Sequence, residues 1–160
     1  LKQWSEADRQ AVDAAMQATN VSELAQRSVD KLSGGQRQRV WVAMVLAQQT
    51  PLLLLDEPTT WLDIAHQIEL LDLFRQLNQE HGHTMVAVLH DLNQACRYAD
   101  HLIVMKQGEI IAQGEPAEII SSDLVQKVFG MESVIIDDPV SHTPMTVPCG
   151  RYHQAQVAGE

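Results

Sequence analysis

The chain has 160 residues, of which 45% are hydrophobic, and its formal net charge at pH 7 is −10. This length corresponds to one ordinary domain that can bury a core. No apolar run approaches the roughly 18 residues that a membrane-spanning helix needs, so we expect a soluble globular chain.

The acidic charge argues against a protein that binds nucleic acid over a broad surface, because phosphates favour a basic face. The two cysteines, Cys96 and Cys149, lack CxxC spacing, which argues against a zinc site or a disulfide framework.

The first part of the chain is predicted to be helical. The segment "SEAD", beginning at Ser5, fits a capping box, and a second short helix is expected from Ser22. The stretch "LSGGQRQRVW" (residues 32–41) then places a Ser-Gly-Gly turn before an apolar run. Because residues 40–47 are apolar nearly all round, we expect a buried helix that stops before Pro51.

Strands and helices alternate after this point. The runs "LLLLDE" (52–57) and "TMVAVLHD" (84–91) have the length of strands buried on both faces, and they flank an amphipathic helix over 64–77. Further expected features are a helix capped by Asp91, a hairpin through Gln107 and Gly108, and a helix from Pro116. This alternation predicts an α/β fold with a parallel sheet and with its chemistry at the carboxyl ends of the strands.

Three polar residues follow the two predicted strands. Asp56 can hold Mg²⁺ through its water shell, and Glu57, which faces the other way, can orient or deprotonate a water molecule. His90, at the tip of the second strand, could donate a hydrogen bond to a γ-phosphate. Taken singly, an acidic pair after a strand is more often made of solvated loop residues, and a lone histidine at a strand end is more often structural.

The Ser-Gly-Gly turn (residues 33–35) has two readings. Ser33 can cap the following helix, while Gly34 and Gly35 let backbone N–H groups approach an anion at the positive end of that helix. An ordinary capped helix start explains the same residues, and the turn alone does not separate the two readings.

The motifs together resemble a known family. "LSGGQRQRV", "LLLLDEPTTWLD" and "VLHD", in this order and at these separations, resemble the nucleotide-binding subunit of ABC transporters. The resemblance implies a partial P-loop NTPase fold, with Asp56 ending the Walker B strand, Glu57 as the catalytic glutamate and His90 as the switch histidine. It also implies that nucleotide is contacted by the signature motif, residues 32–36, and by the D-loop, residues 61–63; the contacting residues are Ser33, Gly34, Gly35, Gln36 and Asp63.

The same resemblance implies ligands and partners. ATP and Mg²⁺ would be bound between two ATPase protomers arranged head to tail, on the cytoplasmic face of the cell membrane. Membrane permease subunits would be direct partners, and a periplasmic or surface substrate-binding protein an indirect one. The segments "TTWLDIAHQIELLDLFRQLN" and "VLHDLNQACRYADHLIVMKQGEIIAQGEP" are similar to importers for ferric siderophores, with haem and vitamin B12 importers as relatives.

The sequence departs from the family in what it lacks. No GxxxxGK[ST] phosphate loop occurs, nor the aromatic adenine-stacking loop or the glutamine loop, and the chain begins with Leu1 rather than Met. We therefore expect a carboxyl-terminal part of an ATPase that is inactive alone and that aggregates or is poorly stable, because the strand near 102–105 would lose its neighbour. Its expected parts are a piece of the helical subdomain (1–31), the signature helix and core (32–138) and a loosely ordered tail (139–160).

Two alternatives remain open. A chromosome-maintenance or DNA-repair ATPase head carries similar motifs, but it would need coiled-coil heptads, and this chain is acidic with short predicted helices. A non-catalytic remnant is compatible with the missing phosphate loop. A phosphate loop in frame upstream of Leu1 would favour a part of an active subunit over the remnant.

Overall fold

The computed structural model describes residues 4–150. The chain divides into two compact units, Leu1–Val88 and Leu89–Glu160. Among the described residues, no helix combines the length and the apolar character needed to cross a membrane. The fold is mixed α/β, as the sequence predicts, and it includes one parallel strand pair.

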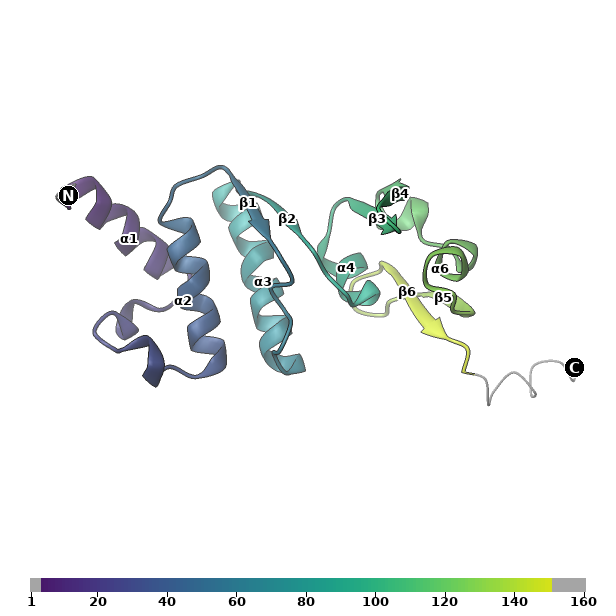
Figure 1. The fold of residues 1–160 in the computed structure, drawn as a ribbon, viewed down its shortest axis with the longest axis horizontal. Coiled ribbons are helices and arrows are strands. Elements are labelled where there is room, and N and C mark those ends of the chain that lie inside the picture. The colour runs from purple at the N-terminus through teal and green to yellow at the C-terminus, as the bar shows by residue number, and fades with distance from the viewer. Residues whose placement is uncertain (1–3, 151–160) are drawn as a thin grey trace, which may run out of the picture. The chain divides into compact units, whose positions relative to one another are not determined.

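The first unit combines helices with a short parallel sheet, and its last helix lies beside the strands (Figure 1). Its elements are α1 (Glu6–Ala18), two 3₁₀ turns (Ser22–Leu24 and Val29–Lys31), α2 (Gly34–Leu46), β1 (Leu52–Leu55), α3 (Ile64–His81) and β2 (Thr84–Ala87). Helix α1 packs against α2, and α3 contacts both α2 and β2. The core of this unit is formed by small and aliphatic side chains and one phenylalanine: Ala11, Ala15, Val21, Leu32, Val42, Ala43, Leu46, Leu53, Leu70, Leu71, Leu73, Phe74 and Leu77.

Polar caps set the starts of the helices in this unit. Ser5 forms the predicted capping box with Asp8 at the start of α1, and Ser33 forms a second capping box with Gln36 at the start of α2. Asp63 caps α3, where its carboxylate accepts a hydrogen bond from the third helical N–H. Each cap satisfies a backbone donor that has no partner within the helix, so these boundaries follow from local sequence.

Strands β1 and β2 pair in parallel, from Leu52 beside Thr84 to Leu55 beside Ala87. The prediction that both strands are buried on two faces is wrong in this chain. Leu53 is buried, but Leu54 is 72% exposed and Val86 is 50% exposed. The burial of β1 alternates along the strand, which shows that only one face of this two-stranded sheet is covered within the described residues. The side chains on the other face therefore stay open to water.

Helix α2 departs from its prediction in the same way. Val42, Ala43 and Leu46 are buried, whereas Trp41 and Met44 are each 56% exposed. The apolar run therefore presents one face to α1 and α3 and leaves another open, because packed neighbours reach only one side of it.

In its described part, up to residue 150, the second unit carries two antiparallel hairpins and three helices. Figure 1 shows them in the green to yellow part of the chain. Its elements are α4 (Leu92–Tyr98), β3 (Leu102–Lys106), β4 (Glu109–Gly114), α5 (Pro116–Ile119), α6 (Ser122–Phe129), β5 (Ser133–Asp137) and β6 (Pro144–Pro148). The predicted turn at Gln107 and Gly108 is confirmed. Both residues have positive φ, +50° and +84°, which is the geometry of the tight hairpin turn that twisted strands favour.

The core of the second unit is built from buried Cys96, Leu102 and Ile120. Partly buried apolar side chains surround this cluster: Leu92, Ala95, Ala99, Ile119, Leu124 and Ile135. Cys96 is fully buried, and this burial, followed by the nearby charge of Asp91, raises the pKa of its thiol to about 11. Cys96 therefore serves as a small core residue.

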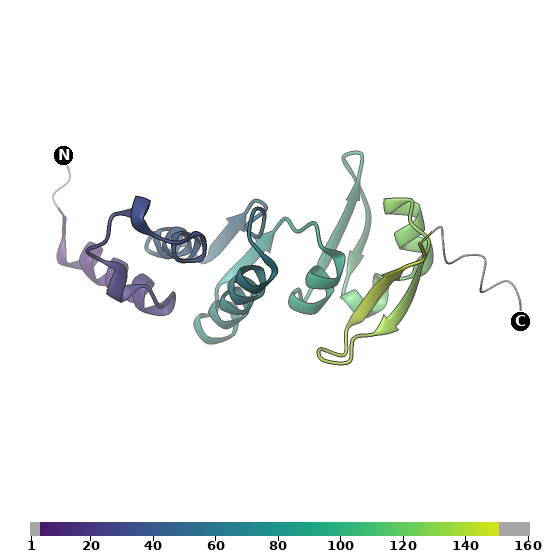
Figure 2. The same cartoon turned by 90° about the horizontal axis from the view of Figure 1, so that it is seen from below.

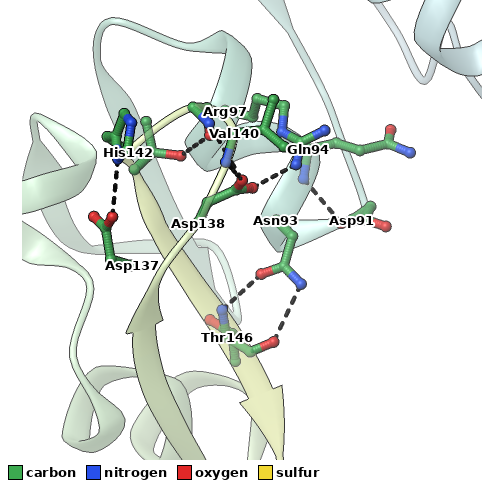
Figure 3. Close-up of polar contacts among 11 residues, drawn as sticks. Asp91, Asn93, Gln94, Arg97, Asp137, Asp138, Val140, His142 and Thr146 are labelled. Atoms are coloured by element: carbon green, nitrogen blue, oxygen red, sulfur yellow. Dashed lines mark hydrogen bonds and ion pairs between the residues drawn. The ribbon is translucent and has the colours of Figure 1, made fainter.

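The expectation of a loosely ordered tail from residue 139 is wrong for residues 144–148. Strand β6 pairs with β5, from Ser133 beside Pro148 to Asp137 beside Pro144, as the hairpin at the yellow end of the chain shows (Figure 2). Two side chains of α4 contact this hairpin: Asn93 bonds to Thr146, and Arg97 pairs with Asp138 (Figure 3). Local composition does not reveal these contacts. Residues 151–160, the rest of that predicted tail, lie outside the described part of the chain.

Candidate functional site

The Ser-Gly-Gly turn forms the amino-terminal end of α2. The Ser33 Oγ accepts a hydrogen bond from the Gln36 N–H at 3.3 Å, and the Gln36 Oε1 accepts one from the Ser33 N–H at 3.2 Å. The capping prediction for Ser33 is confirmed. Because Oγ acts as the acceptor in this cap, the hydroxyl proton of Ser33 remains available for a second contact.

The two glycines of the turn have different surroundings. A β-carbon built on Gly34 would meet nothing within 4 Å, and both Ser33 and Gly34 are exposed. A β-carbon on Gly35 would collide with the imidazole ring of His66, whose Nε2 would lie 2.8 Å away. The exposed end of α2 is therefore open to an anion at Gly34, while a side chain of the same unit covers Gly35.

The acidic pair, Asp56 and Glu57, directly follows β1, as predicted. The pairing of β1 and β2 continues to this end of the sheet, where the Val88 N–H donates to the Leu55 carbonyl at 2.9 Å. Both acids are exposed, and the Thr60 hydroxyl donates to Glu57 Oε2 at 3.2 Å. Glu57 has a φ of +48°, a conformation that a residue with a β-carbon adopts at some cost and that is found disproportionately at functional sites.

The segment from Trp61 to Asp63 connects the acidic pair to α3. Trp61 is 99% exposed and has a φ of +68°. Asp63 Oδ1 accepts a hydrogen bond from the His66 N–H at 3.0 Å, and His66 Nδ1 lies 2.8 Å from both carboxylate oxygens. The backbone hydrogen bond and then the imidazole contact lower the pKa of Asp63, so its carboxylate is ionised across the physiological range.

Contacts that sequence reasoning missed tie α2 to the chain after β1. Gln38 Nε2 donates to the Pro58 carbonyl at 2.8 Å, and Arg39 forms an ion pair with Glu69 of α3 at 3.2 Å. The cover of Gly35 by His66 is a third such contact. Helical spacing offers a signal for some of them, because Gly35 and Arg39 lie four residues apart and so share a face of α2. Sequence alone does not show which helix that face meets.

His90 belongs to the second unit. It is exposed and directly precedes Asp91, whose carboxylate caps α4 by accepting from the Gln94 N–H at 2.9 Å. The predicted cap at Asp91 is confirmed. The grouping of His90 with Asp56 and Glu57 at one edge of a sheet stays a prediction.

The residues of the first unit fit a nucleotide and its metal ion chemically. Asp56 presents an exposed carboxylate, the hard oxygen ligand that Mg²⁺ prefers beside water and phosphate oxygens. The amino-terminal end of α2 presents an open glycine and a serine hydroxyl, which are suited to an anion. These two features come from different elements, so they can serve different parts of a phosphate chain or two different nucleotides.

Comparison with known proteins shows which family the chain resembles. The family model described as "ABC transporter" matches residues 2–60. The chain is 61% identical, over 148 residues, to the ferric enterobactin transport ATP-binding protein of Escherichia coli. This match covers 92% of this chain and 55% of that protein. It is 56% identical, over 151 residues, to a probable siderophore transport ATP-binding protein of Bacillus subtilis, covering 94% of this chain and 55% of that one.

Solved structures agree with this result. The fold matches an inward-facing ABC transporter provisionally assigned to the metal-chelate type, with a TM-score of 0.84, 29% identity and coverage of 95% of this chain and 61% of that one. A dimeric bacterial ABC transporter cassette matches with a TM-score of 0.57 and 32% identity, over 72% of this chain and 50% of that one. The chain spans about half the length of the curated relatives it matches, 55% and 56% for the first two. Residues 2–60 thus match the ABC transporter family, and over most of its length the chain is similar to ATP-binding proteins of that family.

Proposed function

We propose that this chain forms the signature and Walker B part of an ATP-hydrolysing subunit that powers import of a ferric siderophore or a related iron chelate. The observation that carries the proposal is the acidic pair at the carboxyl end of β1, in a chain 61% identical to a ferric enterobactin transport ATP-binding protein. Other relatives are named for achromobactin, petrobactin and hemin transport, so the class of cargo is supported more strongly than any one chelate.

The acidic pair divides the work of phosphoanhydride hydrolysis. Mg²⁺, when bound with ATP, neutralises charge on the phosphates and holds them in one geometry. Asp56 helps to hold this ion through its exposed carboxylate. Glu57 orients the attacking water and accepts its proton, and the hydrogen bond from Thr60 supports the orientation of the carboxylate. His90 donates a hydrogen bond to the γ-phosphate.

The Ser-Gly-Gly turn and Asp63 serve a second protomer in this proposal. Ser33, Gly34, Gly35 and Gln36 contact the γ-phosphate of ATP held by the phosphate loop of the partner, in a head-to-tail dimer. The exposure of Ser33 and the open space around Gly34 support an external ligand here. A solved relative is a dimeric cassette, which supports assembly of two such subunits.

The proposed role in import implies further protein partners and a cellular location. Membrane permease subunits would receive the work of hydrolysis, a periplasmic or surface substrate-binding protein would deliver the chelate, and the subunit would lie at the cytoplasmic face of the cell membrane. The names of the relatives, which are transport ATP-binding proteins, support this arrangement. No role for nucleic acid is proposed, in keeping with the formal charge of −10.

The test uses a hybrid subunit, in which the part of the E. coli ferric enterobactin protein that this chain does not match is joined to this chain. Glu57→Gln in the hybrid should lower ATP turnover by roughly 100-fold or more while ATP binding persists, because the base is lost and the binding groups remain. Glu80→Gln, an exposed acid at the far end of α3, is the matched control and should leave turnover unchanged. Unchanged turnover in Glu57→Gln would overturn the assigned role, and a hybrid that binds but never hydrolyses ATP would favour a non-catalytic remnant.

A further inference from the structure

The side chain of His66 is held firmly on one of its edges. His66 is the third residue of α3, so its backbone N–H reaches the capping carboxylate of Asp63 at 3.0 Å. Its ring Nδ1 lies 2.8 Å from both oxygens of the same carboxylate. A backbone contact and a ring contact to one carboxylate leave the imidazole little rotational freedom. The ring therefore keeps one orientation relative to Asp63.

The opposite edge of the ring covers Gly35. A β-carbon on this residue would overlap the ring Cδ2 and would lie 2.8 Å from Nε2. The recess beside this contact is lined by Gln38 and Leu62, among others, and its volume is about 10 Å³. A space of this size is at the lower limit for one water molecule, so the ring packs directly on the glycine and leaves no room for a ligand between them.

The contact is one of a series along two helices. One turn beyond Gly35, Arg39 pairs with Glu69 at 3.2 Å, and Glu69 lies one turn beyond His66 on α3. Gln38 adds a hydrogen bond from α2 to the Pro58 carbonyl at 2.8 Å. These contacts fix the side of α2 that faces α3. A shift of Asp63 relative to Gly35 would disrupt them together, because packed interfaces move between discrete arrangements rather than deforming smoothly.

We propose that His66 is a positioning residue that sets the spacing between Asp63 and the Ser-Gly-Gly turn. Asp63 binds one edge of the ring, and Gly35 packs against the opposite edge. A change in the position of Asp63 therefore moves the ring relative to the Ser-Gly-Gly turn. This inference rests on the proposed function, in which both segments contact ATP. His66 does not touch the reacting atoms, and its removal should affect the rate of hydrolysis more than the binding of ATP.

The first measurement tests the coupling without ATP. In the hybrid subunit labelled with ¹⁵N-glycine, Asp63→Ala should shift the amide resonance of Gly35, because the released ring leaves its place. In a His66→Ala background, the same Asp63→Ala change should leave that resonance where His66→Ala alone puts it. A shift of equal size in both backgrounds would overturn the proposal, whatever the hybrid does with ATP.

The second measurement concerns turnover. His66→Ala should lower kcat by roughly 5- to 100-fold, as expected when a binding segment is displaced, with KM changed by less than about twofold. His66→Asn retains a donor at the place of Nδ1 and should recover part of kcat. His81→Ala, a histidine deletion at the other end of α3, is the control and should alter neither kcat nor the Gly35 resonance. An unchanged kcat in His66→Ala would contradict the proposal. If the unsubstituted hybrid does not hydrolyse ATP at all, the proposed function is contradicted instead, and the resonance of Gly35 alone tests the coupling.

Discussion

The side-chain amide of Asn93 forms two hydrogen bonds with the backbone of Thr146, 53 residues further along the chain (Figure 3). Its Oδ1 accepts from the Thr146 N–H at 2.8 Å, and its Nδ2 donates to the Thr146 carbonyl at 3.1 Å. One turn later on α4, Arg97 pairs with the buried carboxylate of Asp138. Two side chains of α4 thus hold the hairpin of β5 and β6 in the second unit.

Asn93→Ala should loosen β6. The change leaves the N–H and carbonyl of Thr146 without protein partners in a partly buried place, which costs about 1–3 kcal/mol in the free energy of opening. Hydrogen exchange of the β6 amides in the hybrid subunit measures this cost. Gln113→Ala removes an exposed amide from β4 and should change the exchange by less than about 0.5 kcal/mol. Equal effects of the two changes would contradict the role given to Asn93.

Asp138 should make the stability of the second unit depend on pH. The hydrogen bond from Arg97, followed by that from the Val140 N–H, lowers the pKa of Asp138 from its ordinary 3.8 to about 2. Because the unfolded chain binds the proton more tightly, this contribution is complete above about pH 4 and is lost as pH falls toward 2. The melting temperatures of the hybrid subunit and of Asp138→Asn should therefore differ most near neutral pH and converge below pH 4. A difference that stays constant over this range would show that the carboxylate charge is not responsible.

The two glycines of the Ser-Gly-Gly turn should respond differently to alanine. Gly35→Ala forces a methyl group into the ring of His66 and should destabilise the first unit by about 1–3 kcal/mol, the usual cost of overpacking. Gly34→Ala meets open space and should be neutral or stabilising by up to about 1 kcal/mol, because alanine is the better helix former. Chemical denaturation of the hybrid, followed by the fluorescence of Trp41, measures both changes. Equal losses would show that the ring of His66 moves aside without cost.

The exposed face of β1 and β2 should make the isolated 160-residue chain self-associate. Leu54 and Val86 leave apolar surface open to water, as do Leu52 at 48% exposure and Val88 at 49%. Leu54→Lys should reduce the self-association seen by sedimentation velocity, because a charge on this face opposes pairing of two sheets. Met44→Lys, which adds the same charge to an exposed site on α2, should have a smaller effect. A monomeric wild-type chain with reversible, cooperative unfolding would contradict this prediction.

Helix caps, the hairpin turn and the family resemblance were readable from the sequence because each depends on residues close together in the chain. Ser5, Ser33 and Asp91 cap the helices predicted for them, and the turn at Gly108 follows from its local φ requirement. The place of Asp56 and Glu57 after a parallel strand also follows from the pattern, since four leucines before two acids fit a strand with a polar end. The roles of these residues toward ATP stay predictions, as does the division of the chain at 31 and 138.

Burial and long-range contacts were decided only by the tertiary structure. An apolar run predicts a strand, but whether Leu54 is covered depends on what packs over it, and in this chain one face of the sheet stays open. Residues 139–148 lack periodicity, yet β6 is ordered, since it pairs with β5 and Asn93 of α4 holds Thr146 from 53 residues earlier in the chain. Arg97 of the same helix holds Asp138, which directly follows β5. The close fit of His66 on Gly35 joins two helices that sequence spacing does not place together. Local chemistry thus determined where the elements of this protein begin and end, whereas packing between distant segments decided which of their faces are free.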